Sequence, residues 1–328
     1  MSERMERQTG ESSSSAVKVS KLVKRYGDML ALDYFDLDVH QGEIFGLLGP
    51  NGSGKTTAIN CILALLTFDE GTVRVFDEPI GPTSYALKRR IGIVPQNVAV
   101  FNELTVEENI DYFCSLYVPD RARRHALVED ALDFVGLRDY RRFRPSKLSG
   151  GLLRRLNIAC GVAHKPDLIF FDEPTVAVDP QSRNAIQRLN HEGATVIYTS
   201  HYMEEVEQIC DRILIMDHGR HLALGTADEL KAMIDTGERI SVETDDLGGL
   251  HHEAGTQQAL EQLRALPCVM SADYDGHELT VRCRRGDHNL LDVLTLLKSN
   301  GTNIGHLSSR QPTLNDVFLE LTGTALRD

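Results

Sequence analysis

The sequence predicts an α/β protein of two domains, and three observations lead to this prediction. A glycine-rich loop lies between a short apolar strand, 42–48, and a helical pattern, 58–66. A second apolar run, 168–173, ends in two carboxylates, as a buried parallel strand does where ligands bind beyond its end. From about residue 236 the chain starts a separate alternation of strand and helix patterns, which predicts a smaller second domain.

The glycine-rich loop fits the pattern G-x-x-x-x-G-K-[ST], which binds phosphate groups. Its glycines let successive backbone N–H groups point at phosphate oxygens, and the following helix adds its positive dipole end. We expect Lys55 to neutralise the β- and γ-phosphates and the Thr56 hydroxyl to bind Mg²⁺. The predicted phosphate-binding residues are Gly49, Pro50, Asn51, Gly52, Ser53, Gly54, Lys55, Thr56 and Thr57.

Length and composition limit the number of domains and the possible classes of function. A chain of 328 residues suits two domains. With 48 acidic and 35 basic residues the formal charge is −13, which argues against general nucleic-acid binding. No apolar run is long enough to span a bilayer and no signal peptide is visible, so we expect a soluble, cytoplasmic protein. The six cysteines lack metal-ligand spacing and are interpreted as reduced core residues.

The N-terminal region predicts a tail followed by an antiparallel sheet. Residues 1–16 are polar and serine-rich, which is typical of a disordered tail. Alternating stretches at 17–22 and 30–39 predict a hairpin-like pair of strands. Tyr26 lies between them, either as a half-buried loop tyrosine or as a flat ring on which adenine stacks.

Two further segments follow the loop helix. A strand at 90–94 ends beside Gln96, which either reaches Mg²⁺ and the attacking water or is an ordinary loop residue. Residues 102–165 are mainly helical in pattern, with Thr105 as an N-cap and Glu108 three residues on. Within this block, Ser149-Gly150-Gly151 precedes a helix and offers a second anion site, since its exposed N–H groups have no side chains in the way.

The apolar run at 168–173 places acidic residues at the edge of the predicted sheet. Asp172 is positioned to hold Mg²⁺, and Glu173 to polarise an attacking water. Asp179-Pro180 starts a short helix, and the next buried strand, 194–199, ends in Ser200-His201. His201 is therefore expected to reach the γ-phosphate from the same edge.

With these motifs in order, residues 17–235 resemble the ATP-binding subunit of an ABC transporter. Tyr26 matches the aromatic residue that stacks on adenine, and 49–57 match the Walker A loop. Gln96 matches the Q-loop glutamine. Residues 148–151, with Ser149, Gly150 and Gly151, match the signature motif that only ABC ATPases carry.

The remaining motifs extend the resemblance toward the end of the domain. Asp172 and Glu173 match the Walker B aspartate and the catalytic glutamate. Asp179 matches the D-loop and His201 the switch histidine. The resemblance implies a P-loop NTPase cassette with a RecA-like core, an antiparallel β subdomain and a helical subdomain at about 102–165.

Residues 236–328 resemble the small C-terminal domain of the drug-exporter (daunorubicin-resistance-like) branch, on the ending 312–323. Their patterns also predict the order β-α-β-β-α-β, a ferredoxin-like α+β unit. The predicted strands are 239–244, 269–274, 278–283 and 302–307, and the predicted helices are 256–266 and 288–299.

Three positions depart from the family pattern. Leu152 stands where glutamine is frequent, and Ala177 where glycine is usual before the D-loop. The segment between Asp179 and His201 is about four residues shorter than usual, roughly one helical turn. Loss of a whole turn keeps the helix face in phase, while the D-loop and His201 can shift relative to the phosphate.

The resemblance implies an ATPase that needs ATP and Mg²⁺ and powers export through a separate integral-membrane permease. It also implies a head-to-tail homodimer in which the signature motif of one subunit covers ATP held by the other. Such a subunit lies at the inner face of the cell membrane through its permease, without nucleic acid. The alternatives are a non-transport ABC switch acting on ribosomes or DNA, and a degenerate, non-hydrolysing regulator, which the shortened segment suggests.

Overall fold

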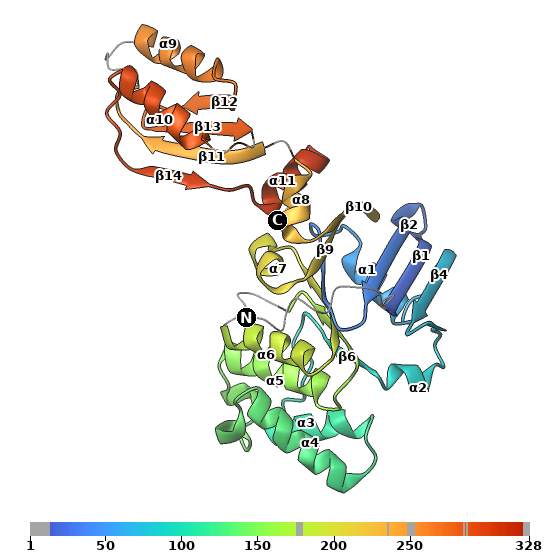
Figure 1. Cartoon of the computed structure of the whole chain (residues 1–328). Coiled ribbons are helices and arrows are strands. Elements are labelled where there is room, and N and C mark those ends of the chain that lie inside the picture. Colours follow the sequence, from blue (N-terminus) through green and yellow to red (C-terminus); the bar gives the residue numbers. More distant parts are fainter. Residues whose placement is uncertain are drawn as a thin grey trace, which may run out of the picture. The chain divides into compact units, whose positions relative to one another are not determined.

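The computed structural model describes residues 14–174, 180–234, 236–247, 253–284, 286 and 288–323. These residues form two compact units that divide between Thr226 and Ala227 (Figure 1). The domain boundary predicted from the sequence, between residues 235 and 236, remains a prediction. Most of the predicted 1–16 tail lies outside the described residues, but Ser15 and Ala16 belong to the first strand, because Ser15 pairs with His40.

The first unit contains two sheets and the helices that connect them. One sheet has the order β2-β1-β4-β5, with all its pairings antiparallel, which confirms the predicted hairpin-like arrangement. The other has the order β10-β9-β3-β8-β7-β6 and is parallel except for β10. The strands are β1 (Ser15–Tyr26), β2 (Met29–His40), β3 (Ile44–Leu48), β4 (Glu70–Val75), β5 (Glu78–Pro79), β6 (Ile91–Val94), β7 (Leu168–Asp172), β8 (Thr195–Ser200), β9 (Arg212–Asp217) and β10 (Arg220–Gly225).

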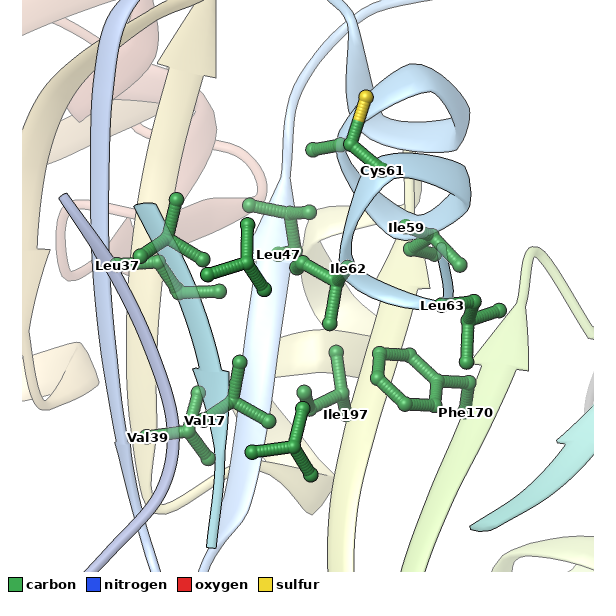
Figure 2. Close-up of a cluster of buried hydrophobic side chains, with 14 of the residues drawn as sticks. Val17, Leu37, Val39, Leu47, Ile59, Cys61, Ile62, Leu63, Phe170 and Ile197 are labelled. Carbon is green, nitrogen blue, oxygen red and sulfur yellow. The ribbon is translucent and has the colours of Figure 1, made fainter. Parts of the chain in front are cut away.

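The core of this unit joins both sheets through the helix after β3. Figure 2 shows side chains of β2, β3, β7, β8 and this helix in one apolar cluster. Phe170 and Ile197 come from the centre of the parallel sheet, where every residue of β3 and β8 is buried. A cluster that includes side chains from both sheets fixes the carboxyl ends of β3, β7 and β8 relative to one another, and these ends carry the predicted site.

The helices of the first unit fall into two groups. Three follow strands of the parallel sheet: α1 (Lys55–Ile62), α6 (Pro180–His191) and α7 (Met203–Ile209), while α2 (Tyr85–Lys88) follows β5 of the antiparallel sheet. The helical block between β6 and β7 contains α3 (Val106–Ser115), α4 (Arg121–Phe134), α5 (Gly150–Val162) and the 3₁₀ turns Arg138–Tyr140 and Pro145–Lys147.

The start of α3 confirms the predicted capping box. The Thr105 hydroxyl accepts from the Glu108 N–H, and the Glu108 carboxylate accepts from the Thr105 N–H. All six cysteines are free thiols, and five of them are buried, while Cys268 is half-buried. None of the helices in the described part of the chain has the length and apolar character needed to cross a bilayer.

The second unit confirms the predicted β-α-β-β-α-β order. Its sheet has the order β12-β13-β11-β14 and is antiparallel throughout, and α9 and α10 pack their apolar faces on one side of it. The elements are α8 (Ala227–Ala232), β11 (Thr236–Glu243), α9 (Glu253–Arg264), β12 (Val269–Tyr274), β13 (Glu278–Arg284), α10 (Asn289–Ser299), β14 (Leu307–Arg310) and α11 (Leu314–Thr322).

The last strand of this unit differs from the prediction. It runs over Leu307–Arg310 rather than 302–307. The Thr302 N–H donates to the Leu297 carbonyl oxygen and closes the end of α10, so Thr302 belongs to the helix C-terminus and not to a strand. Regular pairing with β11 therefore starts only at Leu307.

Candidate nucleotide-binding site

The predicted phosphate loop connects β3 to α1. Two of its positions require glycine because a side chain there would clash with neighbouring backbone atoms. Gly54 has φ 107°, and a Cβ there would lie 2.8 Å from the Ala31 carbonyl oxygen. A Cβ on Gly49 would lie 2.3 Å from the Met216 carbonyl oxygen. Neither position accepts a side chain without backbone movement, so the loop keeps a backbone surface free of Cβ atoms.

Lys55 is the buried cation of this loop. Its side chain is only 3% exposed, and its Nζ donates to the carbonyl oxygens of Gly49 (2.8 Å) and Pro50 (3.1 Å). The same Nζ lies 3.1 Å from Glu173 Oε1. Burial of an ammonium requires such partners, because an unpaired charge in a low-dielectric site is costly.

The loop also has unused capacity for an anion. Ser53 Oγ is buried, and it has no hydrogen-bond partner among the residues that the structure describes. Helix α1 has no side-chain cap hydrogen bond and no acidic residue of its own in the first turn, so its first N–H groups can donate to a bound anion. These donors fit a phosphate group, which supplies acceptor oxygens for the hydroxyl, the N–H groups and the lysine.

The candidate magnesium ligands lie together at the end of β7. The Thr56 side chain lies close enough to Asp172 to lower the pKa of its carboxyl. Asp172 Oδ1 accepts from the Thr199 hydroxyl at 3.1 Å. Burial raises the pKa of Asp172, and the Glu173 charge adds to this effect. The bond from Thr199, the Lys55 charge and the Thr56 side chain act in the opposite direction. A hydroxyl and a carboxylate side by side fit the oxygen ligands that Mg²⁺ prefers.

Glu173 connects three of the predicted site residues. It is buried and has φ 42°, a backbone conformation that is costly for a residue with a Cβ. Its carboxylate contacts Lys55, accepts from Gln96 Nε2 at 3.0 Å, and lies 3.5 Å from His201 Nδ1. The structure therefore brings Lys55, Thr56, Gln96, Asp172, Glu173 and His201 together at the carboxyl edge of the parallel sheet.

Gln96 is also connected to α5 through its backbone. Arg154 of α5 donates from Nη1 to the carbonyl oxygens of Gln96 (2.8 Å) and Pro95 (3.1 Å). Asn157, one turn further, donates to Pro95 (3.1 Å) and accepts from the Ala99 N–H (3.0 Å). The segment after β6 is thus held by the same helix that begins at the signature turn.

Other predicted residues lie apart from this cluster. Tyr26 is exposed at the end of β1, with Lys24 Nζ 5.2 Å from its ring centroid. Ser149, Gly150 and Gly151 are exposed, and the Ser149 hydroxyl caps α5 by accepting from the Leu152 N–H. Asp179 lies outside the described residues.

Three residues of the site were not predicted from the sequence. Thr199 bonds the Glu173 N–H (2.9 Å) and Asp172, and so fixes both acids. Arg154 and Asn157 hold the segment after β6. The two arginines 154 and 155 within the helix pattern gave a usable signal for Arg154, whereas Thr199 within the run 195–200 looks like any strand residue.

Comparisons with known proteins agree with this geometry. The family model "ABC transporter" matches residues 32–176, and the model "ATP-binding protein DrrA1-3-like, C-terminal domain" matches 225–322. The linearmycin resistance ATP-binding protein of Bacillus subtilis (strain 168) is 36% identical over 323 residues, covering 95% of this chain and 100% of the relative. The chain belongs to the ABC transporter ATP-binding proteins.

Further similarity places this ABC ATPase in the drug-resistance branch. The daunorubicin/doxorubicin resistance ATP-binding protein of Streptomyces peucetius is 35% identical, covering 94% of this chain and 92% of that one. A dimeric structure of a post-hydrolysis state of the ATP-binding cassette MJ0796, bound to ADP and Pi, aligns with TM-score 0.58 and 26% identity, covering 64% of this chain and 98% of that one. The predicted fold class and ATPase activity are therefore confirmed.

Proposed function

We propose that this ABC ATPase powers export through a separate integral-membrane permease, with drugs, lipids or similar hydrophobic compounds as cargo. The observation that carries the proposal is the position of Glu173, buried between Lys55 of the phosphate loop and Gln96 of the segment bound to α5. One carboxylate there is in contact with the phosphate site and with Gln96, whose backbone is held by Arg154 of the helical block. This arrangement suits an ATPase whose chemistry moves a neighbouring element.

We assign the chemical roles as follows. Lys55 and the first N–H groups of α1 hold the β- and γ-phosphates, and Tyr26 stacks on adenine. Thr56, Asp172 and Gln96 hold Mg²⁺, which neutralises charge on the phosphate oxygens. Glu173 polarises the attacking water, and His201 contacts the γ-phosphate.

The ion pair between Lys55 and Glu173 supports an ordered start to the reaction. A phosphate in the loop competes with Glu173 for the Lys55 ammonium, because both are anions that use the same donor. Once Lys55 turns to the phosphate, the carboxylate is released to accept a proton from water. Glu173 is thereby inactive as a base until nucleotide arrives.

We infer that two copies close head to tail over two ATP molecules. The exposed Ser149-Gly150-Gly151 turn of one subunit would cover the γ-phosphate bound by the other, with Asp179 at the contact between the two sites. Loss of the γ-phosphate would open the pair. The segment around Gln96 and the helical block 102–165 would transmit this motion to the permease. Because it contacts the permease, the subunit would lie at the inner face of the membrane.

Substitution of Glu173 by Gln tests the assignment of the base. The variant keeps the side-chain shape and is expected to bind ATP while steady-state phosphate release falls by about 100-fold or more. Glu192→Gln, at an exposed ion pair with Arg188, is the matched control and should release phosphate at the parental rate. Parental turnover by Glu173→Gln would contradict the role of Glu173. Absence of phosphate release by the unmodified protein would favour the non-hydrolysing alternative.

A further inference from the structure

Three arginines lie side by side on the sheet of the second unit. Arg239 of β11 is directly opposite Arg282 of β13 on one side and Arg310 of β14 on the other. Residues that face each other in antiparallel pairs project from the same face of a sheet. All three arginines are exposed, whereas their neighbours Ile240 and Val281 are buried in the core beneath α9 and α10. The arginines therefore project from the sheet face that these helices leave open.

The three side chains line one hollow at the start of α11. The hollow has a volume of about 190 Å³. Thr313, the N-cap of α11, contributes to its wall, so the positive end of this helix adds to the charge of the arginines. The complete lining is Gly237, Arg239, Arg282, Arg310, Gln311, Pro312, Thr313, Asn315 and Asp316.

The single carboxylate in the lining offsets at most one of the three positive charges. Asp316 Oδ2 accepts from the N–H and the hydroxyl of Thr313, both at 2.8 Å, and so closes the capping box of α11. Within the described part of the chain, the side chains of Arg239, Arg282 and Arg310 form no ion pair or hydrogen bond. Three guanidinium groups thus share one hollow with a single carboxylate, which leaves positive charge in excess.

Three neighbouring arginines repel one another and destabilise the folded state unless a bound anion offsets their charge. Like charges directly opposite each other on a sheet are destabilising, and this chain, with formal charge −13, has acidic residues in excess. We propose that the hollow lined by Arg239, Arg282 and Arg310 binds a phosphate monoester group. Such a group carries up to two charges and three free acceptor oxygens, which match several guanidinium forks better than one carboxylate does. The group can come from a soluble phosphate compound or from a lipid headgroup.

Hydrogen exchange of the full-length protein tests this site separately from the nucleotide site. Inorganic phosphate, against sodium chloride of equal ionic strength, is expected to slow exchange in peptides that cover β11, β13 and β14 by about threefold or more at saturation. A second arm measures co-sedimentation with phosphatidylcholine vesicles that contain phosphatidic acid, against phosphatidylcholine alone. Protection by phosphate alone assigns a soluble ligand, and added retention on phosphatidic acid assigns a lipid headgroup.

Matched variants make the result specific. Arg239→Gln and Arg282→Gln should abolish the protection, whereas Arg284→Gln, two residues along β13 and outside the hollow, should keep it. Without phosphate, Arg239→Gln should unfold at the same or a higher temperature than the parent, since it removes repulsion. Equal protection in Arg282→Gln and the parent, or no saturable effect of phosphate and phosphatidic acid, would overturn the proposal. Protection by a glutamate-rich peptide but not by phosphate would overturn the choice of ligand.

Discussion

The two anion sites of the first unit differ in how complete they are within one chain. In the phosphate loop, Lys55 and Glu173 are buried and hydrogen-bonded to several elements of the same subunit. In the signature turn, Ser149 and Gly150 are exposed, and an added Cβ at Gly150 would meet nothing within 4 Å. The first site is built by its own sheet, while the second is a surface ready for contact. Nucleotide binding and nucleotide enclosure therefore depend on separate parts of the chain.

Of the changes considered, loss of the Lys55 ammonium should have the largest effect on ATP binding. Lys55→Ala removes the ammonium that faces the phosphates, and we expect ATP affinity to fall by about 100-fold or more. The exposed Lys165→Ala, which loses only a surface pair with Asp130, is the control. Isothermal titration with ATP measures both.

A folding defect must be separated from a binding defect here, because Lys55→Ala also leaves Glu173 buried without its cation. The double variant Lys55→Ala/Glu173→Gln removes that charge and should regain thermal stability without regaining ATP affinity. Unchanged affinity in either variant would contradict the phosphate-loop assignment.

A carboxylate in the signature turn should separate binding from enclosure. Gly150→Asp adds an acid at the first turn of α5, where the helix dipole favours it and no neighbour clashes. ATP affinity of the isolated subunit should stay within about twofold, since the loop is unchanged. Phosphate release should drop by about 100-fold, because the aspartate would repel the γ-phosphate of a partner.

One outcome would contradict the role of the signature turn. If Gly150→Asp hydrolyses ATP at the parental rate and folds normally by circular dichroism, the signature turn has no contact with nucleotide in the active state. Gly150→Ala, which adds volume without charge, shows how much of the loss is electrostatic.

Arg154 should affect coupling more than binding. Arg154→Met removes the donor to the carbonyl oxygens of Pro95 and Gln96 and leaves the phosphate loop intact. We expect ATP affinity near the parental value and phosphate release reduced by about tenfold. Arg124→Met is the control, because Arg124 pairs with Asp111 inside the helical block and does not reach Gln96.

Arg154→Lys keeps a charge and one donor, and should recover part of the rate. If Arg154→Met and Arg124→Met have equal kcat and equal ATP affinity, the contact from α5 to Gln96 has no role in turnover.

The smallest effect concerns the buried end of α5. His164 stacks on Tyr117 with ring centroids 3.8 Å apart, and its Nε2 lies 3.2 Å from the Ile91 carbonyl oxygen. Burial lowers the pKa of His164 to about 4, from 6.5, while the bond to Ile91 acts in the opposite direction. The unfolded chain therefore binds more protons than the folded chain between these pH values, and stability falls as pH falls.

The expected loss from His164 is about 1 kcal/mol between pH 6 and pH 5. Urea unfolding at both pH values measures it. His164→Phe keeps the stack on Tyr117 and should lose about 1 kcal/mol less over that interval than the parent. An equal loss in both proteins would mean that His164 does not titrate as a buried neutral group.

Local chemistry explains why much of the fold was predictable. The phosphate loop, the capping box at Thr105 and the buried strand before Asp172 are determined by neighbours in the sequence, and the structure has them where predicted. The last strand was misplaced, because closure of α10 by Thr302 depends on a backbone bond that no residue pattern reveals.

Non-local pairing explains what the sequence did not show in the site. Thr199 reaches Asp172 only because β7 and β8 pair in a register that places the two residues opposite each other. Arg154 meets Gln96 across 58 residues, through the packing of α5 on β6. The hollow formed by Arg239, Arg282 and Arg310 likewise follows from the register of three strands. Each depends on tertiary structure rather than on spacing along the chain.

ATP-dependent dimerisation of Glu173→Gln tests whether one subunit holds the nucleotide and a second encloses it. Sedimentation velocity of this variant with ATP and Mg²⁺ should show a dimer, and without nucleotide a monomer. Addition of Gly150→Asp to the same variant should return it to a monomer with ATP still bound. A monomer at saturating ATP and Mg²⁺ in Glu173→Gln itself would contradict the claim that one subunit holds the nucleotide and a second encloses it.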